Sequence, residues 1–555
     1  MHKDQQNNTD EYNLTEETVR LVENYKRIIE EEKTQGPYIH VDEIASKVAH
    51  FYENIRAVID WKEEHLLRRT AIERNLKRRL MYEISGVRLI NTLNVDQLSE
   101  SLALELIRGG HFPNDRIPRA KILEVKDILE RYIYILENNP LSGKASNLKI
   151  KDRVNFFNWV IEIAACEIEE LLIPPLKEMV LINFMSEVMF RKIQIDPSIK
   201  ISDDEKFIQI YIASQLTLFR LDKSIVLYRL IKLKYPRWIK TSKEDMDFLT
   251  ENVIKIKEDV EKDFEHQLSN DFYIACEEYD TLFLIICDVF ERLSKEGQSN
   301  FSDEMSNWKK FAEKVVDVYN IRSASLKSRL FKMATFSTLS VLISSAVSLY
   351  IVEVPIAKIL YGRFMPLAML VDILLPTLLM FILVSLVKPP GEKNLENLLI
   401  QLRKIVYKND EFEFYEIRAK KKIGFLLRLF VTIFYLLAAG ISLGVIFWIF
   451  YLAKVPIASV YIDTINVAVI VSAALLIRQK SKELLVEEKS TFWEFILDTM
   501  SVPIGKIGQW VSEKWKEYNI VSVFFTVLVD MPFQTIVDVV ENLSLFIKDK
   551  KARLR

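Results

Sequence analysis

Four long apolar runs in the second half of the chain constrain its fold more than any other feature. Each run has 20 to 25 residues. An α-helix rises about 1.5 Å per residue, so each run is long enough to cross the roughly 30 Å hydrocarbon core of a bilayer. Asp372 and Asp463 are the only formal charges inside them. The sequence therefore predicts transmembrane helices at residues 333–352, 364–387, 429–453 and 455–477.

A repeated phrase pairs these runs into two hairpins. Residues 350–357 read YIVEVPIA and residues 451–458 read YLAKVPIA, so five of eight positions are identical. The prolines in the two copies have no amide hydrogen to continue a helix, which favours a break at each copy. We expect each copy to mark the outer turn of a transmembrane hairpin, with one hairpin over residues 333–387 and the other over residues 425–478.

The distribution of lysine and arginine predicts how the hairpins are oriented. Basic residues gather before the first run, between the second and third runs, and after the fourth. Because basic loops stay on the cytoplasmic side, both termini and the middle loop are expected in the cytoplasm, at a cell or inner membrane. The residues on this side are Arg322, Lys327, Arg329, Lys332, Lys388, Lys393, Arg418, Lys420, Lys421, Lys422, Arg428, Arg478, Lys480 and Lys482. Lys358, Arg363 and Lys454 lie on the other side.

The remainder of the chain has the composition of an all-α protein. Only 13 of 555 residues are glycine, and no stretch alternates polar and apolar residues in the manner of a strand. Ser202 with Glu205, and Thr241 with Glu244, have the spacing of a helix capping box. We expect a disordered tail over residues 1–13 and a cytoplasmic helical domain over residues 14–320.

Two further cytoplasmic segments are predicted beside the hairpins. Residues 388–424 form a linker with an amphipathic helix, and residues 479–555 form C-terminal amphipathic helices. Within the latter, residues 481–500 have an amphipathic pattern. Residues 521–547 are apolar but interrupted by charges and a proline, and we interpret them as a helix pair that lies on the membrane or packs on the bundle, with a fifth span as the less favoured alternative.

Three polar residues in the predicted spans could form an ion path. Asp372 and Asp463 each occupy the second helix of a hairpin, and Asn466 follows Asp463 by one turn. A carboxylate in hydrocarbon is costly and often marks a route for ions or protons. The competing interpretation, which we favour, is that both aspartates lie near span ends and reach water or headgroups.

Small residues in the spans are candidates for close helix packing. Gly440 and Gly444 form a GxxxG pattern in the third run, while Ser340 and Ser344 belong to a serine stripe in the first. Small residues let helix backbones approach, and serine hydroxyls can bond across the contact. A water-lined pore face is the alternative interpretation of the stripe.

A basic segment of the cytoplasmic domain is a candidate for binding anionic lipid headgroups. A membrane-tethered domain meets such headgroups constantly. Aromatic residues are interleaved with the basic ones, a pattern that also suits RNA or single-stranded DNA, although nucleic acid is not the ligand we expect. A solvated charged face is the more ordinary explanation. The candidate residues are Arg229, Lys232, Lys234, Arg237 and Lys240.

The sequence contains none of the common catalytic or metal-binding motifs. The six histidines form neither HExxH nor ExxH, and no cofactor is expected. The favoured hypothesis is a non-enzymatic scaffold or tether, held in the bilayer and acting on a cytoplasmic protein partner. The alternative is a homo-oligomeric channel or transporter built from the duplicated hairpins. An enzyme without a recognisable motif is the least favoured.

Overall fold

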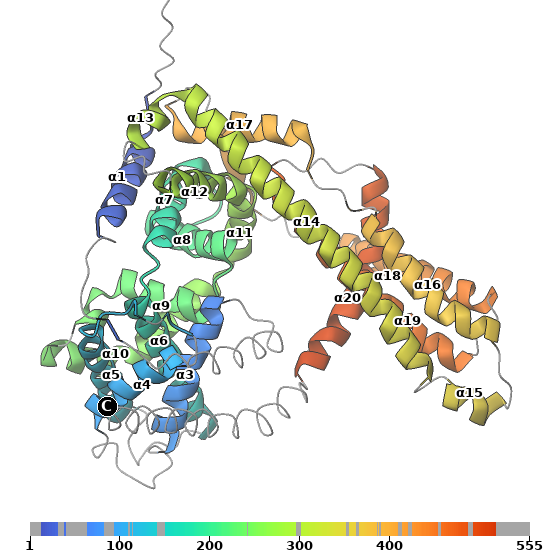
Figure 1. Ribbon diagram of the computed structural model, residues 1–555, viewed down its shortest axis with the longest axis horizontal. Helices are drawn as coiled ribbons and strands as arrows, with labels where there is room; N and C mark the ends of the chain where they lie inside the picture. The colour runs from blue at the N-terminus through green and yellow to red at the C-terminus, as the bar shows by residue number, and fades with distance from the viewer. Residues whose placement is uncertain are drawn as a thin grey trace, which may run out of the picture. The chain divides into compact units, whose positions relative to one another are not determined.

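The structure is a computed structural model in which most of the chain is helical, so the predicted all-α class is confirmed (Figure 1). The predicted tail, apart from residue 13, and residues 521–547 lie outside the described part. The structure describes residues 13–31, 38–39, 64–82, 94–108, 111–113, 115–140, 150–240, 242–295, 301–350, 354–361, 366–385, 387, 390–408, 413–419, 424–452, 457–486 and 492–517.

The chain divides into two compact units. The C-terminal unit comprises Met1–Thr18, Ile195–Ile199 and Glu278–Asn519, and the N-terminal unit comprises Val19–Gln194, Lys200–Glu277 and Ile520–Arg555. The division near residue 278 falls earlier than the end of the predicted cytoplasmic domain at residue 320.

The N-terminal unit is a bundle built around α6, which contacts α3, α5 and α9. Apolar residues of α6 such as Ile161, Ala165 and Ile168 are fully buried. The helices are α1 (Glu16–Glu31), α3 (Glu64–Tyr82), α4 (Val95–Arg108), α5 (Lys121–Asn138), α6 (Ile150–Leu172), α7 (Leu176–Lys192), α8 (Asp203–Phe219), α9 (Lys223–Lys234), the 3-10 helix η3 (Pro236–Ile239), α10 (Lys243–Phe264) and α11 (Ser269–Glu277).

Helix caps in this bundle follow the sequence closely. Ser202 accepts a hydrogen bond from Glu205 N while Glu205 accepts one from Ser202 N, so the predicted capping box is confirmed. The second box was expected at Thr241, but Ser242 caps α10 instead by accepting from Asp245 N. Adjacent Ser and Thr residues are both good caps, so pattern alone does not choose between them.

The C-terminal unit combines a polar helix group with a set of apolar helices. The chain also has two short strands, β1 (Ile193–Ile195) and β2 (Tyr415–Ile417), and within this unit Asp196 N donates to Ile417 O at 3.0 Å. The helices are α12 (Asp280–Lys295), α13 (Phe301–Ser306), α14 (Trp308–Ser348), α15 (Val354–Tyr361), α16 (Pro366–Ser385), α17 (Glu392–Val406), α18 (Phe425–Leu452), α19 (Ile457–Ser481) and α20 (Phe492–Glu517).

Helix α14 is unbroken over 41 residues, which corresponds to about 60 Å, and it joins the two parts of this unit. Its first half packs on α12, α13 and α17, with Phe311 and Val315 buried. Its second half contacts α16 and α19, and Figure 1 shows α16, α18, α19 and α20 gathered near that end. The same helix therefore passes from a polar neighbourhood to an apolar one.

Two helices in the described part are long and apolar enough to cross a membrane by length and composition. They are Trp308–Val347 and Phe425–Ile449, while Ile373–Ser385 is a shorter apolar helical stretch. Large apolar side chains on them face outward, including Phe336, which is 67% exposed, and Ile441, which is 60% exposed. The finding weakly indicates membrane association, and the four predicted spans remain a prediction.

The apolar helices share one core. Val467, Ala468 and Val471 of α19 pack with Ile504 of α20. Leucines of α16 and Ile446 of α18 cover this cluster. The helices of the two predicted hairpins are thus packed together and do not stand as separate pairs.

Candidate functional site

Asn394 on α17 ties together three segments that lie next to the apolar helices. Its Nδ2 donates to Tyr319 Oη on α14 at 3.1 Å and to Leu484 O after α19 at 2.6 Å. Its Oδ1 accepts from Val486 N at 2.9 Å. The side chain is buried, so these bonds satisfy groups that water does not reach.

Ion pairs reinforce the same meeting point, which we call the junction. Arg329 Nη2 of α14 lies 2.8 Å from Glu483 Oε1, and Thr281 of α12 donates to Glu483 O at 3.0 Å. Arg322 of α14 makes two bonds to Asp288 of α12, one of them at 2.9 Å. The junction therefore binds the segments before the first predicted span, between the hairpins and after the fourth.

Aromatic packing extends the junction to the end of α17. Tyr407 donates to Met305 O at 2.5 Å, and its ring meets those of Trp308 and Phe311 at centroid distances of 5.8 Å and 6.5 Å. Thr15 N donates to Val406 O at 3.0 Å, which attaches the N-terminal segment of this unit. The arrangement can hold together four segments of the chain: the N-terminal segment, the region of α12 to α14, α17, and the segment after α19.

Replacing Asn394 with leucine should destabilise the junction by about 3 kcal/mol, because Leu484 O and Val486 N would remain buried without partners. The measurement is the thermal unfolding of the detergent-solubilised chain. Lys393→Ala, at the adjacent exposed position, is the matched control. A melting temperature of Asn394→Leu equal to that of the control would contradict this role.

The N-terminal unit has a second polar centre, formed by carboxylates on α6. Glu167 pairs with Arg131 and accepts from Tyr132 Oη at 2.7 Å, both on α5. Trp238 Nε1 in turn donates to Tyr132 Oη at 2.9 Å. Glu169 Oε1 lies 3.0 Å from Arg68 Nε. The acidic run therefore fixes α6 to its neighbours.

Burial changes the titration of two groups on α6. The pKa of Glu169 rises to about 7, because burial disfavours its charged form more than Arg68 favours it. Burial likewise raises the pKa of Cys166 well above its usual value, so this thiol stays protonated. Cys166 and Cys276 are both buried, which is typical of cysteines that serve as small apolar residues.

The free energy of unfolding of the wild type should depend on pH through Glu169, and Glu169→Gln should remove this dependence. The folded pKa lies above the ordinary value of 4.5, so the native state holds a proton that the unfolded state has released. Wild-type stability should therefore fall by about 3 kcal/mol as pH rises from about 4.5 to about 7. Urea unfolding followed by tryptophan fluorescence at several pH values measures this. The exposed Glu124→Gln is the control, and equal slopes in the two variants would refute the assignment.

The predicted basic segment is largely neutralised within the protein. Lys232 pairs with Glu170, which also lies 3.9 Å from the buried Arg229. Lys234 bridges Asp259 and Asp263, and Arg237 lies 3.7 Å from Asp245. Lys240 is exposed. Binding of anionic lipid or nucleic acid through this segment stays a prediction. These ion pairs reduce the positive charge that is available to such a ligand.

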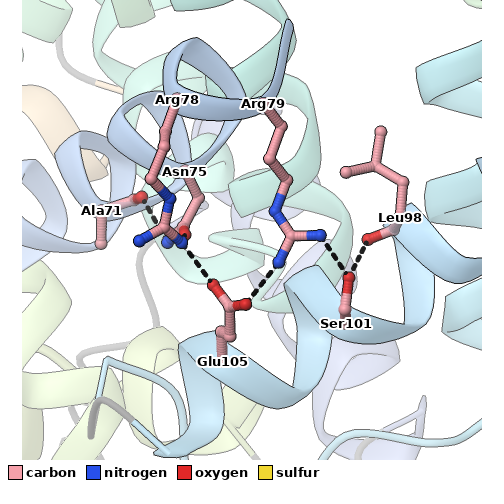
Figure 2. A network of polar contacts seen from close by, with 7 residues as sticks. All are labelled: Ala71, Asn75, Arg78, Arg79, Leu98, Ser101 and Glu105. Carbon is pink, nitrogen blue, oxygen red and sulfur yellow. Dashed lines mark hydrogen bonds and ion pairs between the residues drawn. The ribbon is translucent and has the colours of Figure 1, made fainter. Parts of the chain in front are cut away.

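The basic face of α3 is paired in the same way (Figure 2). Arg78 and Arg79 both reach Glu105 of α4, and Arg78 does so at 2.9 Å. Arg79 also donates to Ser101 Oγ at 2.6 Å. These contacts fasten α3 to α4 within the bundle, which is a structural use of charge.

The residues of the proposed ion path lie on α16 and α19, whereas the proposed packing residues lie on α14 and α18. Asp372 lies on α16 and Asp463 on α19, with their side chains outside the described part, while Asn466 on α19 is half-buried. Ser340 and Ser344 are exposed on α14, where the neighbouring Ser345 is buried instead.

The sequence did not predict one very close helix contact among the described residues. Gly440 and Gly444 are exposed, and an added Cβ at either would meet no described atom within 4 Å. By contrast, a Cβ at Gly508 of α20 would overlap the backbone of Ala468. The sequence signal for this contact is the pair Gly505 and Gly508, which lies outside the four predicted spans.

No protein family, curated protein or solved structure matches the chain. Among the described residues, no group of three or more His, Cys, Asp or Glu side chains could hold a metal ion. The site is therefore defined by its contacts alone.

Proposed function

We propose that this protein is a membrane-anchored, non-enzymatic scaffold or tether. Two helical hairpins hold it in the bilayer, and the N-terminal unit works on the cytoplasmic side, where it binds a protein partner. The observation that carries the proposal is α14, which is one continuous helix with a packed polar half and an outward-facing apolar half.

The exposed apolar side chains support the bilayer as the surrounding medium. Soluble monomers rarely expose contiguous apolar patches of more than a few hundred Å². Here outward apolar residues follow α18 along its length, from Phe425 at 78% exposure to Trp448 at 60%. Lipid acyl chains match such a surface.

The junction supports the two-hairpin topology. The segments before the first span, between the hairpins and after the fourth span all contribute to it. These three segments can meet on one side only if an even number of membrane crossings separates them. This agrees with the positive charge that the sequence concentrates in the same segments.

Labelling of single introduced cysteines with a membrane-impermeant maleimide tests the topology. Lys327→Cys, Lys393→Cys and Lys480→Cys should react from one side of the membrane, and Lys358→Cys from the other. All four native residues are exposed in the structure. Reaction of Lys327→Cys and Lys480→Cys from opposite sides would overturn the two-hairpin arrangement.

A homo-oligomeric channel or transporter is the second candidate. The observation that favours it is the exposed Gly440–Gly444 pair, which leaves a face of α18 open to another copy. Reconstituted wild-type protein would then conduct ions, and Asp372→Asn or Asp463→Asn would reduce the flux. A monomer without flux would exclude the channel and favour the tether.

A further inference from the structure

Helix α20 packs antiparallel on the middle of α19. A Cβ added at Gly508 would overlap Ala468 O and lie 2.8 Å from Val469 N, so the two backbones touch there. A Cβ added at Gly505 would lie 3.9 Å from Ser472 Cα. Three residues forward on α20 thus correspond to about four residues backward on α19.

The contact with α19 shows how far this part of α20 lies from the end of the fourth apolar run. The fourth apolar run ends at residue 477, so Ser472 and Ala468 lie about 7 and 13 Å into it along the helix axis. If α19 crosses the membrane, as in the function proposed above, Gly505 and Gly508 lie inside the apolar layer. Ile504 is buried in the same core as Val467 and Val471.

Lys506 gives a second measure of depth, from a different helix. Its Nζ lies 5.6 Å from the centroid of the Tyr435 ring on α18. Tyr435 is about 9 Å beyond residue 429, where the third apolar run begins. The contacts with α18 and with α19 therefore place this turn of α20 at a similar distance inside the two apolar runs.

A lysine at this level can be accommodated. Side chains of a helix tilt toward its N-terminus, so the Lys506 stem points back toward the surface from which α20 enters. A lysine stem of four methylenes can lie along apolar surface while its ammonium stays nearer to the headgroups. The face of the Tyr435 ring adds a favourable cation–π contact.

The outer face of this turn is suited to lipid. Ile507 is 41% exposed and Trp510 is 60% exposed, beside residues that are buried against α19. We propose that the turn of α20 over residues 504–510 is embedded in the membrane beside α18 and α19, with Ile507 and Trp510 facing lipid acyl chains and Lys506 anchoring the helix toward the headgroups. The proposal rests on α19 being a span, and it revises the cytoplasmic placement predicted for residues 479–555.

Nitroxide labels test the proposal on the full chain in phosphatidylcholine liposomes. Ile507→Cys and Trp510→Cys replace exposed residues, so their labelling should leave the fold intact. Relaxation by oxygen should exceed relaxation by a water-soluble nickel chelate, as it should for Ile441→Cys on α18. Lys393→Cys should show the reverse. Signal from native cysteines is subtracted with protein that has no added cysteine.

The labels on α18 separate two kinds of failure. If Ile441→Cys is in lipid but Ile507→Cys and Trp510→Cys are accessible to nickel, α20 lies outside the membrane and this inference is overturned alone. If Ile441→Cys is accessible to nickel as well, the membrane anchor itself fails. If all three are in lipid, α20 is embedded.

Discussion

Replacing both Leu437 and Ile441 with arginine is expected to lower the fraction of the protein that stays in the membrane, because α18 would no longer contribute to the anchor. Both residues are largely exposed on α18, so the change removes little packing. In a bilayer, each arginine near the centre of a span costs about 3 kcal/mol. Alkaline carbonate extraction followed by immunoblotting measures the membrane-retained fraction.

The matched control places alanine at the same two positions, which keeps the helix and adds no charge. It should stay in the membrane fraction, since alanine is tolerated in hydrocarbon. On a surface in contact with water, the two arginines would instead be harmless or would improve solubility. Equal retention of the arginine and alanine variants would therefore argue against a contribution of α18 to the membrane anchor.

Glu167→Leu should be the most damaging single substitution in the N-terminal unit. It leaves the Arg131 guanidinium, which is 2% exposed, without its carboxylate. Breaking a buried ion pair from one side costs about 3 to 5 kcal/mol. Urea unfolding followed by tryptophan fluorescence measures the loss, because Trp159 and Trp238 pack against each other at a centroid distance of 6.3 Å in this core.

Two comparisons isolate the buried charge as the cause. Glu124→Leu removes an exposed partner of Lys121 and should cost no more than about 1 kcal/mol. Adding Arg131→Met to Glu167→Leu should restore part of the lost stability, since no uncompensated charge remains. A double variant as unstable as the sum of its parts would contradict the pairing.

The helical class and the apolar helices were predictable because both depend on local periodicity and composition. The repeated phrase also fell near helix ends, since α15 begins at Val354 and α19 at Ile457. Contacts between distant segments were not predictable in this way. Asn394 has an ordinary place on an amphipathic helix, and only the fold brings it to Leu484 and Val486.

The local charge pattern of the sequence did not predict which basic side chains are paired within the protein. Arg229 and Lys232 stand in a stretch without acids, yet both meet Glu170 from a helix about 60 positions earlier. The small-residue pattern was incomplete for a related reason. Gly440 and Gly444 match a known spacing, whereas Gly508 lies next to Ala468 through an approach of α20 that no local pattern encodes.

The unbroken course of α14 gives the protein a rigid lever. A helix of about 60 Å without an internal break has no hinge at the point where its surroundings change from polar to apolar. A tilt of about 10° at its apolar end would therefore shift the opposite end by about 10 Å. In the proposed topology, a change in bilayer thickness or tension at the apolar end of α14 would therefore move Trp308, and a force on the junction would tilt the apolar end in the bilayer.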